Sequence, residues 1–148
     1  MEASRGKANL LVALQFVALL LLVLNPFAVF QEVERIFSLT LYVIAMVILA
    51  SAAVALGSAL TASPIPKDDA ELVTRGIYKW IRHPMYTALI LIGLGLMLGT
   101  FNLFSLFVFT GLVVVLLYKS HYEDGLLADK HRSAAKYQSE TGRFFPRF

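Results

Sequence analysis

Four apolar runs dominate this chain and constrain its fold more than any other feature. They cover residues 9–30, 36–60, 84–99 and 102–118, and only short polar segments separate them. A helix needs about 20 apolar residues to cross the hydrocarbon of a bilayer. The first two runs reach that length, whereas the last two are shorter. The pattern predicts a membrane protein made of helices.

The composition supports the membrane class and excludes several others. Charged residues make up 16% of the chain, against about 25% in soluble domains, so they are too few to cover a soluble globule. The chain has no cysteine, which excludes disulfides and thiolate chemistry. The small net charge of +3 does not indicate nucleic acid as a partner. The three histidines (His83, His121 and His131) lack the spacing of metal ligands, and we predict no metal site.

The first run, residues 9–30, is interrupted only by Gln15 and by the pair Asn25–Pro26. A cleaved signal peptide is an alternative, because a basic start before an apolar core looks similar. The run is longer than a typical signal core and lacks a small-x-small cleavage site. We therefore expect a retained helix.

The other runs predict three further helices. Small residues crowd the second half of run 36–60, which allows close helix packing in lipid. The last two runs, joined at Thr100–Phe101, predict a helical hairpin in which Gly93, Gly95 and Gly99 permit close contact; one re-entrant element is the alternative. Helix-forming residues continue to Leu127. The predicted fold is all-α and polytopic, with four transmembrane helices at about 9–30, 36–60, 84–99 and 102–127, a C-terminal hairpin and a cytoplasmic helical extension.

The basic residues predict the orientation. All of them except Arg35 lie before the first helix, between the second and third, or after the fourth. With four spans these regions share one side, which the positive-inside rule makes cytoplasmic. We expect an integral, multi-pass protein with both termini in the cytoplasm.

The polar stretch 71–86 is rich in aromatic and basic residues. Pro84 suits the first position of a helix, so the amides of Met85, Tyr86 and Thr87 would be free to bind an anionic group. The stretch thus indicates a pocket for a carboxylate or phosphate.

An interfacial function of the same stretch is the alternative. Lys79 and Arg82 would then meet lipid headgroups, and Tyr78, Trp80 and Tyr86 would form an aromatic belt. In either case the hairpin brings residues 82–83 close to residues 119–123.

An ordered set of motifs extends this interpretation. The set consists of Leu72-Val73-Thr74, Gly76 and Tyr78; Arg82-His83-Pro84 and Tyr86; Glu123-Asp124 and Leu127; and finally Tyr137 and Arg143-Phe144-Phe145-Pro146. Together these residues resemble the isoprenylcysteine carboxyl methyltransferase family and the related phospholipid methyltransferases. The resemblance covers about residues 57–148.

The resemblance implies one membrane methyltransferase-like domain over residues 1–148, with its cofactor region at 63–148. It implies methyl transfer from S-adenosylmethionine to a lipophilic acceptor, an isoprenoid or phospholipid carboxylate, amine or thiol. The implied cofactor-binding residues are Glu71, Leu72, Val73, Tyr78, His83, Pro84, Met85, Tyr86 and Glu123. The implied catalytic residues are Lys119, Glu123 and Arg82, of which Lys119 also binds the substrate.

Some positions depart from the family pattern. Lys119 stands where the prenylcysteine enzymes have arginine, which removes a bidentate carboxylate fork. Asp124 replaces a glutamate, and the tail has His131 and Ala134 at altered positions. A non-catalytic membrane subunit with the same fold, or a sterol-reductase-like NADPH enzyme, are the alternatives. The sequence does not predict the acceptor or the oligomeric state.

Overall fold

The computed structural model describes residues 2–28, 32–66 and 71–147. Within these ranges it contains helices, turns and one isolated backbone bridge, so the predicted all-α class is confirmed there. The helices are α1 (Glu2–Val23), α2 (Glu32–Leu56), α3 (Pro84–Gly99), α4 (Leu103–Lys130) and α5 (Ala134–Glu140), with short 3-10 helices η1 (Gly57–Ala59) and η2 (Gly76–Lys79).

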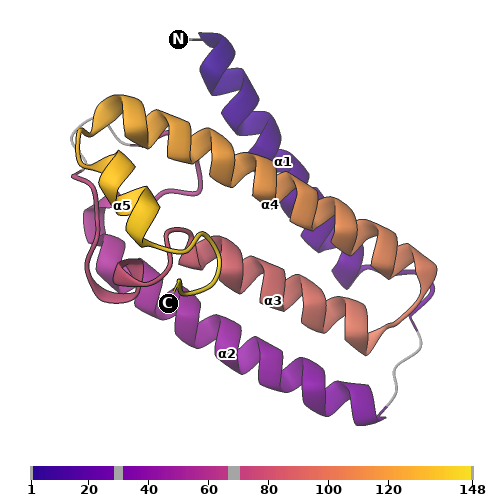
Figure 1. The fold of residues 1–148 in the computed structure, drawn as a ribbon. Helices are drawn as coiled ribbons and strands as arrows, with labels where there is room; N and C mark the ends of the chain where they lie inside the picture. The colour runs from indigo at the N-terminus through magenta and orange to yellow at the C-terminus, as the bar shows by residue number, and fades with distance from the viewer. Residues whose placement is uncertain (1, 29–31, 67–70, 148) are drawn as a thin grey trace.

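The long helices pack in pairs. Helices α3 and α4 form the predicted hairpin, α2 packs along α3, and α1 packs against α4 (Figure 1). The segment between α2 and α3, the short helix α5 and the C-terminal tail gather at one end of this bundle (Figure 1). The functional site is therefore expected at that end, where the polar segments meet.

Three helices are long and apolar enough to cross a membrane, judged by length and composition. They are the segments Arg5–Val23, Arg35–Ala59 and Leu103–Lys130. Helix α3 is apolar but has only 16 residues. The chain is thus an integral membrane protein with three candidate spans and one shorter apolar helix, and the count of four spans stays a prediction.

The predicted bounds of the first helix, 9–30, are wrong. Helix α1 begins at Glu2 and ends at Val23, because helix formers precede the apolar run and the pair Asn25–Pro26 ends it. Asn25 accepts a hydrogen bond from the amide of Phe27 (3.0 Å), which stabilises a turn instead of another helical turn. Residues 29–30 lie outside the described ranges.

The other predicted bounds are closer. Helix α3 begins at Pro84 and ends at Gly99, as predicted. Helix α2 ends before the predicted residue 60, because Gly57 has φ +53°, which an α-helix excludes. Helix α4 continues past the predicted Leu127 to Lys130.

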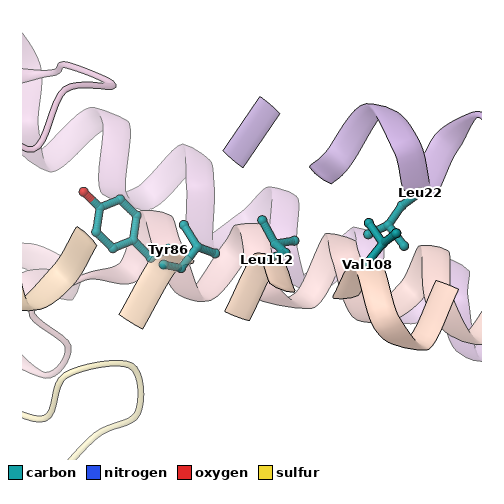
Figure 2. Close-up of a cluster of buried hydrophobic side chains, with 5 residues drawn as sticks. Leu22, Tyr86, Val108 and Leu112 are labelled. Carbon is teal, nitrogen blue, oxygen red and sulfur yellow. The ribbon is translucent and has the colours of Figure 1, made fainter. Parts of the chain in front are cut away.

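The core of the bundle lies between α1, α3 and α4. One buried cluster runs along α4 through Val108, Leu112 and Leu116, and Figure 2 shows Leu22 of α1 beside Val108 at one end and Tyr86 of α3 at the other.

Close helix approach depends on the α3 glycines, but not all of them face the hairpin partner. A Cβ at Gly93 would lie 2.7 Å from Leu112 of α4, as expected for the hairpin. At Gly95 it would lie 2.6 Å from Tyr42 of α2. The second half of α3 is therefore in tight contact on two sides, with α4 at Gly93 and with α2 at Gly95.

Candidate functional site

The segment before α3 is held against α2 by a tight turn. Gly76 adopts φ +61°, a conformation that favours glycine, and a Cβ there would lie 3.3 Å from Ala55. This turn buries Tyr78 against Ala52 and Ala55 of α2. The small residues of α2 therefore provide the close packing surface that the sequence predicts.

The C-terminal tail lies beside the same segment. The amide of Arg82 donates to the carbonyl of Gly142 (2.8 Å), and the amide of His83 donates to that of Arg143 (3.0 Å). The hydroxyl of Tyr137 donates to the carbonyl of Tyr78 (2.7 Å). Two polar segments almost sixty residues apart in sequence are thereby joined by backbone hydrogen bonds.

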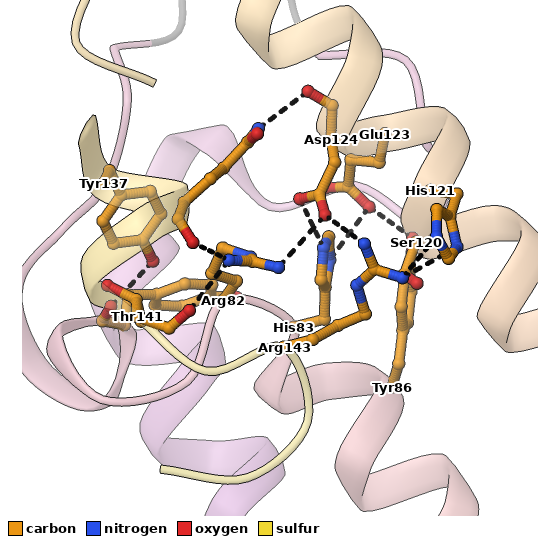
Figure 3. A network of polar contacts seen from close by, with 12 residues as sticks. Arg82, His83, Tyr86, Ser120, His121, Glu123, Asp124, Tyr137, Thr141 and Arg143 are labelled. Atoms are coloured by element: carbon orange, nitrogen blue, oxygen red, sulfur yellow. Dashed lines mark hydrogen bonds and ion pairs between the residues drawn. The ribbon is translucent and has the colours of Figure 1, made fainter. Parts of the chain in front are cut away.

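Asp124 of α4 is the centre of a charged cluster (Figure 3). Its carboxylate lies 2.9 Å from His83 Nε2, 3.4 Å from a guanidinium nitrogen of Arg82 and 3.2 Å from one of Arg143. Asp124 is buried, and burial of a charge is costly unless it is paired. The cluster satisfies that requirement and ties α4 to the central segment and the tail.

Glu123, the neighbouring carboxylate, faces a different set of groups. It accepts a hydrogen bond from the hydroxyl of Tyr86 (2.5 Å) and lies 3.6 Å from His83 Nδ1 (Figure 3). Its side chain keeps 27% exposure, against 10% for Asp124. Asp124 therefore connects three basic side chains inside the protein, whereas Glu123 is the carboxylate that is still accessible from the pocket.

His83 has a carboxylate at each ring nitrogen. Burial lowers the pKa of His83, but the hydrogen bond to Asp124 and the nearby carboxylate of Glu123 outweigh it, and the net effect raises the pKa above its usual 6.5. Burial raises the pKa of Tyr78 and of Tyr137, so both remain neutral phenols.

Several of these groups, among them Glu123, His83 and Tyr78, line one pocket that is open to solvent. The lining residues are Leu56, Ala59, Thr61, Ser63, Pro66, Glu71, Leu72, Val73, Tyr78, Arg82, His83, Met85, Tyr86, Glu123, Leu127 and Tyr137. Of the predicted cofactor residues only Pro84, which is buried as the first residue of α3, is not part of this lining.

Sequence reasoning missed part of the pocket wall. Leu56, Ala59, Thr61, Ser63 and Pro66 come from the end of α2 and the loop after it. The sequence did contain a hint of this wall. A run rich in small residues gives way there to the segment Ser63-Pro64-Ile65-Pro66, shortly before the predicted cofactor residues. Leu127 and Tyr137 stand in the quoted motifs, but no site function was assigned to them.

Two expectations about the central stretch need correction. The amides of Tyr86 and Thr87 are not free, because both donate to the carbonyl of His83 (3.0 Å each). Tyr78 and Tyr86 are buried, whereas Trp80 is 51% exposed. Only Trp80 thus suits an interfacial belt, and anion binding would depend on side chains more than on helix amides.

The predicted substrate residue Lys119 does not line this pocket. Its ammonium donates to the side-chain oxygen of Gln15 (2.7 Å) and to the carbonyl of Ala62 (2.9 Å). It also lies 5.0 Å from the centre of the Tyr86 ring. Lys119 is therefore separated from the pocket, with Tyr86 in contact with both.

The pocket's donor set fits S-adenosylmethionine. Carboxylates of Glu71 and Glu123 suit its positively charged groups, and Arg82 and His83 suit its carboxylate. The guanidinium of Arg82 is held by Asp124 and by the carbonyl of Thr141 (2.8 Å), which fixes its orientation at the pocket wall. Leu56, Val73 and Leu127 supply apolar walls for an aromatic base.

A partly polar pocket at the end of an apolar helical bundle defines the class as a membrane protein with a candidate small-molecule site. Comparison with protein families finds that residues 38–129 match the isoprenylcysteine carboxyl methyltransferase (ICMT) family. The match covers more than half of the 148 residues, and the chain belongs to this family of membrane methyltransferases. No curated protein matches the chain.

Proposed function

We propose that this protein transfers a methyl group from S-adenosylmethionine to a lipophilic acceptor at the cytoplasmic face of the membrane. One observation supports this most directly. Residues from the central segment, the start of α3 and the end of α4 line a single pocket, and its charges match those of S-adenosylmethionine. When bound, this molecule supplies a methyl group on a positively charged sulfur.

Glu123 is proposed to stabilise that positive charge. Its carboxylate is fixed by the hydroxyl of Tyr86 and remains partly exposed in the pocket. Because a methyl transfer depends mainly on alignment and exclusion of water, a fixed carboxylate contributes by holding the reacting group in one orientation.

Arg82 and His83 are proposed to bind the carboxylate end. Asp124 holds both side chains in place, which lowers the entropy cost of binding a ligand between them. Glu71, Leu72, Val73, Tyr78, Met85 and Tyr86 are proposed to form the remaining cofactor wall, and Pro84 acts through its position at the start of α3.

The acceptor is proposed to come from the bilayer, an isoprenoid or a phospholipid. The apolar outer faces of the bundle expose large hydrophobic side chains, and a lipid can approach along them without leaving the membrane. The concentration of basic residues beside the pocket supports a cytoplasmic location for this end. Lys119 is proposed to bind the acceptor.

Calorimetry of the detergent-solubilised protein tests cofactor binding. S-adenosylmethionine and S-adenosylhomocysteine are expected to bind, and Glu123→Gln to weaken binding by about 1–3 kcal/mol through loss of a charge-assisted interaction. Glu140→Gln is the matched control, because Glu140 is exposed on α5. A protein that binds neither molecule at millimolar concentration is not a methyltransferase of this kind.

Transfer of radiolabelled methyl into a total membrane lipid extract tests catalysis and identifies the acceptor together. The wild-type protein is expected to transfer label into a lipid fraction, and the pocket variant Glu123→Gln is not. Cofactor binding without any labelled lipid would favour a non-catalytic subunit.

A further inference from the structure

Gln15 is a polar side chain on the buried face of α1. Ala8, Leu11 and Leu22 share that face with it, at spacings that place them on one side of a helix. Gln15 is only 4% exposed, and α1 lies outside the family-matched residues. A buried polar group needs a hydrogen-bond partner. The side-chain oxygen of Gln15 accepts a hydrogen bond from Lys119, which lies 104 residues away in the sequence.

The ammonium of Lys119 is enclosed by protein groups. Lysine has three N–H donors, and two are directed at the oxygens of Gln15 and Ala62. The Tyr86 ring lies against the same ammonium, and Lys119 is only 1% exposed. An acceptor that binds Lys119 must therefore displace one of these partners.

Gln15 is the partner that can be replaced. The Ala62 oxygen belongs to the backbone and follows the end of α2, whereas Gln15 presents a neutral amide on a flexible side chain. An anionic oxygen adds a Coulomb attraction to the ammonium that the neutral amide of Gln15 lacks, and this attraction is stronger in a buried site than in water. A carboxylate or phosphate oxygen thus competes successfully with the amide of Gln15 for Lys119.

We propose that the side-chain oxygen of Gln15 occupies the position that an oxygen of the methyl acceptor takes in the complex. When the acceptor binds Lys119, the acceptor oxygen displaces the oxygen of Gln15. The inference rests on the proposed function and adds α1 to the site. It assigns the acceptor an anionic oxygen close to the atom that receives the methyl group. An amine or thiol lipid without such an oxygen does not displace Gln15.

Kinetics of two Gln15 variants test the displacement. Methyl transfer is measured with phosphatidylethanolamine and with farnesylcysteine, each in uncharged maltoside micelles. Gln15→Leu removes the competitor, so the KM for the acceptor falls about two- to tenfold, as expected for one hydrogen bond. Gln15→Glu places a carboxylate on Lys119, and the KM rises at least about tenfold while kcat is recovered at high acceptor concentration. The lipid that is methylated identifies the source of the oxygen.

Asn9→Leu is the matched control, because it makes the same change at an exposed position of α1. It leaves the KM unchanged, and S-adenosylhomocysteine binds all three variants with wild-type affinity. If Gln15→Leu and Gln15→Glu shift the KM in the same direction, or lower kcat alone, Gln15 does not compete with the acceptor.

A second measurement does not depend on activity. The chain has three glutamines, Gln15, Gln31 and Gln138, so ¹⁵N-glutamine labelling yields few side-chain amide signals, and Gln15→Leu assigns one of them. Addition of phosphatidylethanolamine or farnesylcysteine, each of which carries an anionic oxygen, shifts the Gln15 signal in a saturable manner, whereas dodecylamine leaves it unchanged. A Gln15 signal that neither lipid moves overturns the inference even when S-adenosylhomocysteine binds. A shifted Gln15 signal without cofactor binding supports the lipid subsite and refutes the methyltransferase proposal instead.

Discussion

The two ends of helix α4 use polar side chains in different ways. At its start, Asn102 accepts a hydrogen bond from the amide of Ser105 (2.8 Å) and donates to the carbonyl of Phe27 (3.2 Å). Asn25 donates to the hydroxyl of Thr100 (3.1 Å) close by. These groups are all neutral and bind one another. The hydrogen bonds at this end connect the loop after α1 with the turn before α4.

The other end of α4 is charged and not closed. Asp124 binds His83, Arg82 and Arg143, whereas Glu123 stays partly exposed in the pocket. Neutral pairs stabilise a membrane bundle at modest cost, whereas charged groups are costly there and generally mark function. The difference supports our proposal that the first end holds the helices together and that the second end binds the ligand.

The largest effect is expected from Asp124→Ala. The change leaves His83, Arg82 and Arg143 without their shared carboxylate, and removal of one partner from a buried ion pair costs about 3–5 kcal/mol. Denaturant titration in mixed micelles measures the loss of unfolding free energy. Asp129→Ala, at an exposed position of the same helix, is expected to change it little; equal effects of the two variants would contradict the buried cluster.

A smaller loss is expected from Gly142→Ala. A Cβ at Gly142 would overlap the carbonyl oxygen of Phe145, so the tail must move away from Arg82 and His83. Overpacking of this kind costs about 1–3 kcal/mol. Cofactor affinity is expected to fall as well, because backbone hydrogen bonds to the tail hold Arg82 and His83 at the pocket.

Gly125→Ala is the control for the tail variant. Nothing lies within 4 Å of a Cβ at Gly125, and alanine in a helix interior stabilises by about 0.5–1 kcal/mol relative to glycine. Calorimetry with S-adenosylhomocysteine separates the two variants. Unchanged affinity in Gly142→Ala would show that the tail does not support the pocket.

Asn25→Ala tests the neutral end. It removes the bonds to Thr100 and to the amide of Phe27, which is expected to lower the unfolding free energy by about 1–2 kcal/mol. Cofactor affinity and methyl transfer should remain at wild-type values, because the pocket lies at the far end of α4. A loss of cofactor affinity comparable to that in Glu123→Gln would contradict the division between the two ends. Asn9→Ala, on the exposed face of α1, controls for the loss of an amide.

The smallest effect is expected from pH. Because the pKa of His83 is raised in the folded state, its protonated form contributes stability that is complete below about pH 6.5, the unfolded value. This contribution is lost as the pH rises through the folded pKa of His83. Titration of the unfolding free energy between pH 6 and 9 should show the decline, and His83→Gln should flatten it. An unchanged slope in His83→Gln would assign the decline to another group.

Local chemistry explains which parts of the fold could be predicted. Pro84 sets the start of α3 by its own backbone geometry, and the prediction of 84–99 is confirmed. The first helix was misplaced because apolar length measures the hydrocarbon crossing, whereas Asn25 and its turn determine where the helix ends. The distinction between Asp124 and Glu123 was not accessible either, since adjacent carboxylates look alike until their neighbours are known.

The membrane class, the all-α architecture, the hairpin and the family could be predicted from the sequence, because apolar run length, proline position and motif order can be read along the chain. The three-dimensional contacts were needed to show that Asp124 binds three basic side chains and that Lys119 is enclosed by Gln15 and Ala62. Those pairings join residues up to 104 positions apart. They depend on which faces of α1 and α4 meet. Hydrophobicity does not identify these faces, because several faces of each helix are similarly apolar and packing in lipid depends on shape and polar contacts.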